Sequence, residues 1–178
     1  MKKIKITLVL LAGMTLSFSS FAQNSKTIAS VDFKIRNLGI NVDGRFKQST
    51  ITTNFTSPDH TQWSLSGSVE TKSIDTDNNK RDKHLKEEDY FDVDAFPKIT
   101  LKATNFKKVS AQKYDVTAKL TIKETTKTIT IPMEIIGDAN SFKLRSNFEI
   151  NRRDYGVGGS SLILSNTVKI SVYYVLNN

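Results

Sequence analysis

The sequence contains no cysteine, two histidines and three prolines among its 178 residues. Without cysteine there are no disulfides, so stability has to come from burial and backbone hydrogen bonds. A zinc site is not expected, because no thiolate is available and His60 and His84 are well separated, one in a solvated turn and one on an exposed helix face. No nucleophile elbow, phosphate-binding glycine loop or dinucleotide fingerprint is present. The sequence therefore predicts no enzyme, no metal and no cofactor.

Long hydrophobic runs are also scarce. The run Ile6–Leu16 follows three lysines and precedes small residues that end at Ala22. This pattern predicts a signal peptide over residues 1–22, which is cleaved before Gln23, and a periplasmic or secreted protein. The run is too short to span a membrane comfortably.

Net charge and length limit the partners and the domain count. The formal net charge is +8, of which three positive charges belong to the leader lysines. The remainder does not indicate nucleic acid. Solvated lysines on the outer faces of the strands are the favoured explanation, and the alternative is transient contact with an anionic membrane surface or an anionic headgroup. Residues 23–178 are long enough for one domain with a substantial core, as a monomer or a homodimer.

The dominant pattern after the leader is an alternation of apolar and polar residues with a period of two, as in residues 31–36. It is typical of antiparallel strands with one wet face. A strand from about Val42 to Phe55, with a bulge near 48–50, brings the number of strands to eight. Short turns, such as residues 123–127 and 137–141, connect them. An eight-stranded antiparallel β-barrel is the predicted fold, since closure leaves no exposed edge, and a two-sheet sandwich is the alternative.

The polar segment Asn78–Asp94 interrupts this alternation. Asp82 is the predicted N-cap of a short helix that continues through Glu88. We expect the helix to lie across one end of the barrel, with Leu85 and Phe91 turned inward.

An eight-stranded barrel is either filled by side chains or holds one slim ligand. The inward positions are almost all apolar, so a ligand has to be apolar along most of its length, and each buried methylene contributes about 0.8 kcal/mol. Charged residues near the barrel mouth form either a closing ion pair, such as Arg152 with Asp82 or Asp154, or contacts to a ligand headgroup. The predicted ligand-binding residues are Phe33, Ile35, Phe46, Trp63, Leu65, Phe91, Leu101, Val116, Leu120, Ile131, Met133, Phe148, Arg81, Asp82, Arg152 and Asp154.

Several motifs resemble the YceI-like family of lipid- or polyisoprenoid-binding periplasmic proteins. The resemblance extends in order from Ser30 to Leu176, with Asn37 where the family often has histidine and Glu124 where it has glycine. Its most specific stretches are Ser73-Ile74-Asp75-Thr76, Arg81-Asp82-Lys83-His84-Leu85, Asp89-Tyr90-Phe91-Asp92 and Phe96-Pro97-Lys98-Ile99.

The resemblance implies a lipocalin-like eight-stranded barrel with one short helix, about residues 80–90, at one end. It also implies an isoprenoid, a quinone or a similar lipid inside, and a role in lipid handling or stress. We therefore predict a non-catalytic carrier. The alternatives are a solid-cored envelope interaction protein without ligand, and an enzyme that acts on a lipid headgroup.

Overall fold

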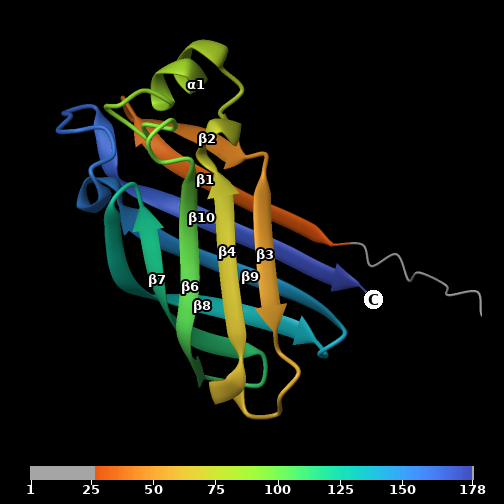
Figure 1. Cartoon of the computed structure of the whole chain (residues 1–178). Coiled ribbons are helices and arrows are strands. Elements are labelled where there is room, and N and C mark those ends of the chain that lie inside the picture. The colour runs from red at the N-terminus through yellow and green to blue at the C-terminus, as the bar shows by residue number, and fades with distance from the viewer. Residues whose placement is uncertain (1–26, 178) are drawn as a thin grey trace, which may run out of the picture.

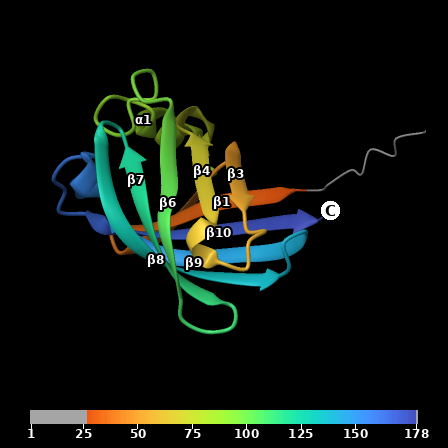
Figure 2. The same cartoon turned by 60° about the horizontal axis from the view of Figure 1, so that its bottom comes forward.

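The computed structural model describes residues 27–177, so the predicted signal peptide lies outside the described residues. The chain forms one antiparallel sheet whose strand order is β3-β4-β6-β7-β8-β9-β10-β1-β2-β5. The sheet curls around a common interior (Figures 1 and 2). The strands are β1 (Ile28–Asn37), β2 (Ile40–Phe46), β3 (Ser49–Asn54), β4 (Ser64–Glu70), β5 (Ile74–Asp75), β6 (Lys98–Lys108), β7 (Lys113–Ile122), β8 (Thr125–Gly137), β9 (Ser141–Asn151) and β10 (Leu164–Asn177).

The antiparallel all-β architecture is confirmed, but the predicted strand count of eight is wrong and the sandwich alternative is excluded by the single ten-stranded sheet. The expected strand from Val42 to Phe55 is interrupted at Lys47 and Gln48, which separate β2 from β3. β2 pairs with β1, whereas β3 pairs with β4 at the other end of the strand order. This bend therefore connects the two ends of the curled sheet. The two-residue strand β5, which pairs with β2, supplies the other extra strand.

The alternation places its apolar parity inside. Phe33 lies between Gly44 of β2 and Ile170 of β10 in the strand register. The Phe33 ring covers Gly44 so closely that a Cβ atom there would lie 2.2 Å from the ring. Glycine at position 44 is thus required by the inward-leaning ring rather than by backbone conformation.

The helix is shorter than expected and starts earlier. α1 (Asn79–Leu85) is capped by Asn78, whose side chain accepts a hydrogen bond from the Arg81 backbone N–H at 3.0 Å. The prediction that Asp82 is the N-cap is wrong, because Asp82 lies inside the helix and is buried. As expected, the helix lies at one end of the curled sheet (Figure 1).

The interior at the end opposite α1 is packed with aromatic rings. Phe55 contacts Trp63, Phe106 and Phe142, with ring centroids 4.8, 5.8 and 5.2 Å apart. His60 begins the 3-10 helix η1 (His60–Gln62) and packs edge-on against Trp63, with ring centroids 4.3 Å apart, so His60 is half-buried rather than solvated as expected. This aromatic cluster closes that end of the interior.

Two further 3-10 turns shape the end near α1. η2 (Thr71–Ser73) leads from β4 into β5, and η3 (Arg152–Tyr155) follows β9. Gly156 ends η3 in the left-handed conformation, with φ of 68°. Both turns therefore direct chain segments across the end of the sheet rather than along it.

Candidate functional site

A cavity of about 370 Å³ occupies the interior between the aromatic cluster and α1. Alternate residues of β1 and β10 form part of its wall, including Val31, Phe33, Ile35, Val168 and Ile170. Because strands present every second side chain to the same face, the period-two pattern itself produces this apolar wall. The volume lies at the lower end of the range typical of small-molecule sites.

The cavity reaches the surface between α1 and the loop after η3. His84 of α1 and Ile163 of that loop both line it, and both are exposed. Tyr90 stacks edge-on against His84, with ring centroids 4.8 Å apart, and also lines the opening. These three residues therefore mark the mouth of the cavity.

Twelve of the sixteen residues predicted to bind ligand line the cavity, and four lie elsewhere. Trp63 belongs to the aromatic cluster and donates from its indole nitrogen to the Ser57 carbonyl at 2.7 Å. Val116 is completely buried in the packed core. Asp82 and Asp154 are bonded within the protein, as described below. The twelve that line the cavity are Phe33, Ile35, Phe46, Leu65, Phe91, Leu101, Leu120, Ile131, Met133, Phe148, Arg81 and Arg152.

Arg152 is buried, with 3% of its surface exposed, and its bonding differs from the expected ion pair. The guanidinium donates to the backbone carbonyls of Val157, Gly158 and Gly159 at 2.6, 2.5 and 3.0 Å, and to that of Ser165 at 2.9 Å. Burial lowers the pKa of Arg152. Its charge is thus solvated by carbonyl dipoles, and the side chain holds the loop between η3 and β10 in place.

The predicted mouth-closing pair of Arg152 with Asp82 or Asp154 is therefore wrong. Asp154 instead forms an ion pair with Lys127, at 3.4 Å, on the surface. Asp82 accepts hydrogen bonds from the backbone N–H and the hydroxyl of Thr76, at 2.9 and 2.5 Å. A carboxylate inside a helix is satisfied here by the preceding segment, which local sequence rules do not anticipate.

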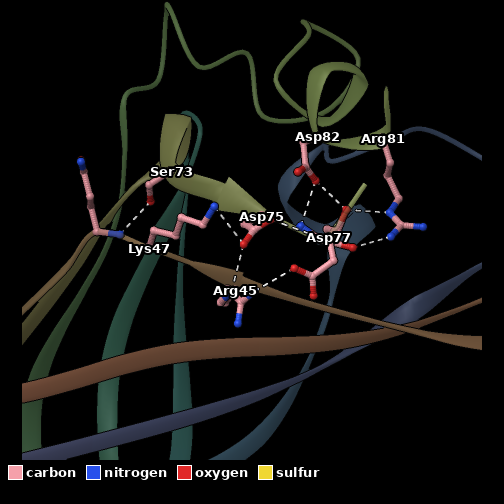
Figure 3. Close-up of polar contacts among 9 residues, drawn as sticks. Arg45, Lys47, Ser73, Asp75, Asp77, Arg81 and Asp82 are labelled. Carbon is pink, nitrogen blue, oxygen red and sulfur yellow. Dashed lines mark hydrogen bonds and ion pairs between the residues drawn. The ribbon is translucent and has the colours of Figure 1, made fainter. Parts of the chain in front are cut away.

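Arg81 secures the same segment from the other side (Figure 3). Its guanidinium donates to the Thr76 hydroxyl at 2.7 Å and to the Thr76 carbonyl at 2.6 Å. Thr76 is thus bonded by both Arg81 and Asp82, and it also lines the cavity. This arrangement fixes α1 over the cavity.

A charged cluster outside the cavity attaches β5 to β2 (Figure 3). Asp75 accepts from Lys47 and Arg45, each at 3.0 Å, and Arg45 also pairs with Asp77 at 2.9 Å. Hydrogen bonds from Lys47, the Asp77 backbone and Arg45 lower the pKa of Asp75 to about 2. Asp75 is therefore ionised at neutral pH and stabilises the rim that carries α1.

Many cavity residues were not predicted from the sequence. Most of them are further strand residues, and a smaller group lies outside the strands. Tyr90, Val157 and Ile163 come from loops, and Asn37 ends β1. In this region Gly158 packs against Tyr90 and donates from its backbone N–H to the Asp89 carbonyl at 2.8 Å. The motifs around Leu85 and Tyr90-Phe91, together with Arg152, were the signals in the sequence that pointed to this end.

Two further searches of the described residues were negative. Residues 27–177 contain no group of three or more His, Cys, Asp or Glu side chains arranged to hold a metal ion. In the same part of the chain, no helix has the length and apolar character needed to cross a membrane.

Comparison with known proteins places the fold and the family. The chain is 33% identical over 113 residues to a UPF0312 protein of Vibrio parahaemolyticus, a match that covers 63% of this chain and 60% of that protein. BcnA of Burkholderia cenocepacia has the same fold, with a TM-score of 0.78 and 22% identity over 83% of this chain and 95% of that one. A polyisoprenoid binding domain from Saccharophagus degradans is similar with a TM-score of 0.66 and 14% identity, over 84% and 94% of the two chains.

A family model assigns most of the chain. The model of the YceI-like domain matches residues 23–176, which include all the residues that line the cavity and all of the sheet except Asn177, the last residue of β10. The resemblance inferred from the motifs near Asp75, Arg81 and Tyr90 is confirmed. The chain belongs to the YceI-like domain family.

Proposed function

We propose that this protein is a non-catalytic binding protein that holds one long apolar lipid, of the isoprenoid or isoprenoid-quinone type, inside its curled sheet. The observation that carries the proposal is the cavity of about 370 Å³, whose wall is formed mostly by aliphatic and aromatic side chains. A ligand there loses contact with water along its chain, and each buried methylene contributes about 0.8 kcal/mol. The structural neighbour named for polyisoprenoid binding supports the ligand class.

The shape of the site favours a chain-like ligand. The cavity is closed at one end by the aromatic cluster around Phe55 and opens at the other between His84 and Ile163. An unbranched or isoprenoid chain therefore enters with its tail first and leaves its headgroup at the mouth. Three basic side chains, Arg81, His84 and Arg152, line the cavity at this end, and His84 also pairs with Glu87 at 3.1 Å. The alternative of a completely filled interior is wrong because the cavity is present.

Lipid extraction tests the proposal. Protein expressed from the full-length gene is purified without detergent, and native mass spectrometry and organic extraction identify any bound lipid. The matched variant is Val168→Phe, which projects a larger ring into the cavity from β10. We expect an apolar lipid at near one equivalent in the unaltered protein and far less in Val168→Phe, with both folded by circular dichroism. Absence of lipid from the unaltered protein, together with no uptake of added polyprenol, would contradict the proposal.

We also propose that the protein acts in the periplasm or outside the cell, from the leader pattern over residues 1–22. The mass of the protein recovered from a periplasmic extract tests this. A chain that begins at Gln23 is the expected result. A chain that retains residues 1–22 and stays in the cytoplasm would overturn it.

A further inference from the structure

We propose that the rim of the cavity mouth is a membrane-docking surface, formed by the tip of the β1–β2 hairpin and the loop between η3 and β10. The surface consists of four aliphatic side chains, Leu38, Ile40, Leu162 and Ile163. It fits the interfacial region of an anionic lipid bilayer. The proposal rests on the proposed function, since a protein that takes up a membrane lipid has to meet the membrane at its mouth.

The four side chains are unusually exposed and lie together. Leu38 and Ile40 are 67% and 70% exposed, Ile163 is 53% exposed and Leu162 is fully exposed. The Leu38 backbone N–H donates to the Ile163 carbonyl at 2.9 Å, which joins the hairpin tip to the loop. Clustered exposed aliphatic residues of this kind mark interaction sites, whereas single ones are ordinary.

The surface is continuous with the cavity. Ile163 belongs to both, and Asn37, next to Leu38, also lines the cavity. In Figures 1 and 2 the hairpin tip, the loop and α1 lie at the same end of the molecule. A bilayer in contact with this surface would therefore face the opening directly, and an apolar chain could pass between them without crossing water.

The backbone conformation of Leu38 gives a second, independent reason to assign this residue to a docking surface. Leu38 occupies the left-handed region with φ of 51°, followed by Gly39 with φ of 78°. In two-residue hairpin turns of this kind, asparagine or glycine fits the first position, and a bulky aliphatic side chain is strained there. A leucine that is 67% exposed is thus held where asparagine or glycine would be more stable, as expected if it contacts something outside the protein.

The net charge of the chain suits an anionic bilayer, because it stays positive after the three leader lysines are removed. The loop from Gly156 to Leu164 carries no charged residue, and Arg36 is the charged residue nearest the hairpin tip. On α1 the exposed charged side chains, Lys80 and Lys83, are positive and Asp82 is buried, whereas the turn after α1 carries the exposed acidic residues Glu87, Glu88 and Asp89, of which Glu87 pairs with His84 at 3.1 Å. Uncharged aliphatic loops flanked by basic residues insert at the headgroup boundary and gain from anionic lipids.

Vesicle binding tests the docking surface. The triple variant Leu38→Asn, Ile40→Thr and Leu162→Ser changes only side chains that do not line the cavity. The control variant, Val109→Ser with Ile136→Thr, removes exposed aliphatic residues at the other end of the molecule. Cosedimentation is measured with vesicles of phosphatidylcholine alone and with added phosphatidylglycerol.

We expect the triple variant to partition about tenfold or more weakly than the unaltered protein, and the control to bind as the unaltered protein does. Phosphatidylglycerol should strengthen binding of the unaltered protein, and high salt should cancel that gain. The thermal midpoint of Leu38→Asn alone should equal or exceed that of the unaltered protein, because asparagine accepts the left-handed turn.

Three results would overturn the proposal: no vesicle binding by the unaltered protein, equal binding by the triple variant, or equal loss in the control. A dimer that the triple variant converts to a monomer, with vesicle binding unchanged, would instead assign the surface to contacts between copies of the chain. Lipid extraction from the same preparations separates the two proposals. Bound lipid without vesicle binding would contradict only the proposed docking surface. Vesicle binding without bound lipid would contradict only the proposed ligand.

Discussion

The two ends of strand β9 differ in what surrounds them. Phe142, near its start, is 3% exposed and packs against Phe55 and Tyr174, with ring centroids 5.2 and 5.8 Å apart. Phe148, six residues later, is half-buried and lines the cavity. Both point to the same interior, so burial alone does not define their roles. One end of the interior is packed with aromatic rings, and the other contains the cavity.

Truncation of these two phenylalanines should give the largest difference in stability loss between the packed end and the end with the cavity. Phe142→Ala leaves a hole among packed rings and should lower the free energy of unfolding by about 3–5 kcal/mol. Phe148→Ala enlarges a space that already exists, so about 1–2 kcal/mol is expected. Urea unfolding of delipidated protein measures both. Equal losses would mean that the two ends are packed alike.

Removal of the buried guanidinium tests how the open end is held. Arg152→Met leaves the carbonyls of Val157, Gly158 and Ser165 without their donors and should cost about 2–3 kcal/mol. Amide hydrogen exchange should increase in the loop between η3 and β10. The exposed neighbour Arg153 supplies the control, and Arg153→Met should leave both measurements unchanged. If Arg152→Met exchanged no faster than Arg153→Met, the loop would be held by other contacts.

Added volume should be tolerated at only one end. Ala118 is completely buried on β7, opposite Ala103 and Ile129, and Ala118→Leu should cost about 1–3 kcal/mol through overpacking. Val168→Phe fills part of the cavity and should change stability by less than about 1 kcal/mol. Thermal midpoints of the delipidated proteins compare the two. A larger loss in Val168→Phe than in Ala118→Leu would contradict the placement of the cavity.

The charged cluster around Asp75, which joins β5 to β2, should give the smallest effect on stability. The effect should be visible as a dependence of stability on pH. The pKa of Asp75 is about 2 in the folded protein and near 3.9 when the chain is unfolded. The unfolded chain therefore takes up the proton first, so the stabilisation is complete above about pH 5 and is lost as pH falls toward 2. Asp75→Asn should be less stable at neutral pH and should lose less stability on acidification.

The exposed pair of Lys34 with Asp43, at 3.0 Å, provides the control for this measurement. Asp43→Asn should leave the dependence of the free energy of unfolding on pH as it is in the unaltered protein, because exposed ion pairs contribute little to stability. An unchanged curve for Asp75→Asn as well would mean that acid unfolding starts elsewhere in the molecule.

Strand parity could be predicted from the sequence because it depends on neighbours two residues apart. Phe33 and Leu101 were assigned inward on this basis, and both line the cavity. Parity does not say how far along the barrel axis a residue lies, which is why Trp63 and Val116 were assigned to the ligand site although they belong to the packed end. The position of the cavity becomes evident only after all the strands are assembled.

The charged residues were harder to predict for a related reason. Asp82 was expected to cap the helix, but its partner is Thr76, six residues earlier and outside the helix. Arg152 was expected to pair with a carboxylate or a ligand headgroup, yet its acceptors in the protein include the backbone carbonyls of Val157 and Gly158. A charge that is satisfied by backbone atoms leaves no complementary charge in the sequence for a pattern to detect.

The pairing of β1 with β10 has a consequence for when the binding site comes into existence. The register joins Ile28 to Val175 and continues to Ile35 and Val168, so the first strand of the sheet lies along the last. Side chains from both strands form the cavity wall. Ribosomes produce β1 first and β10 last, so a nascent chain has no enclosed wall until its final strand is available. The lipid proposed for this cavity would therefore enter the finished protein rather than the nascent chain.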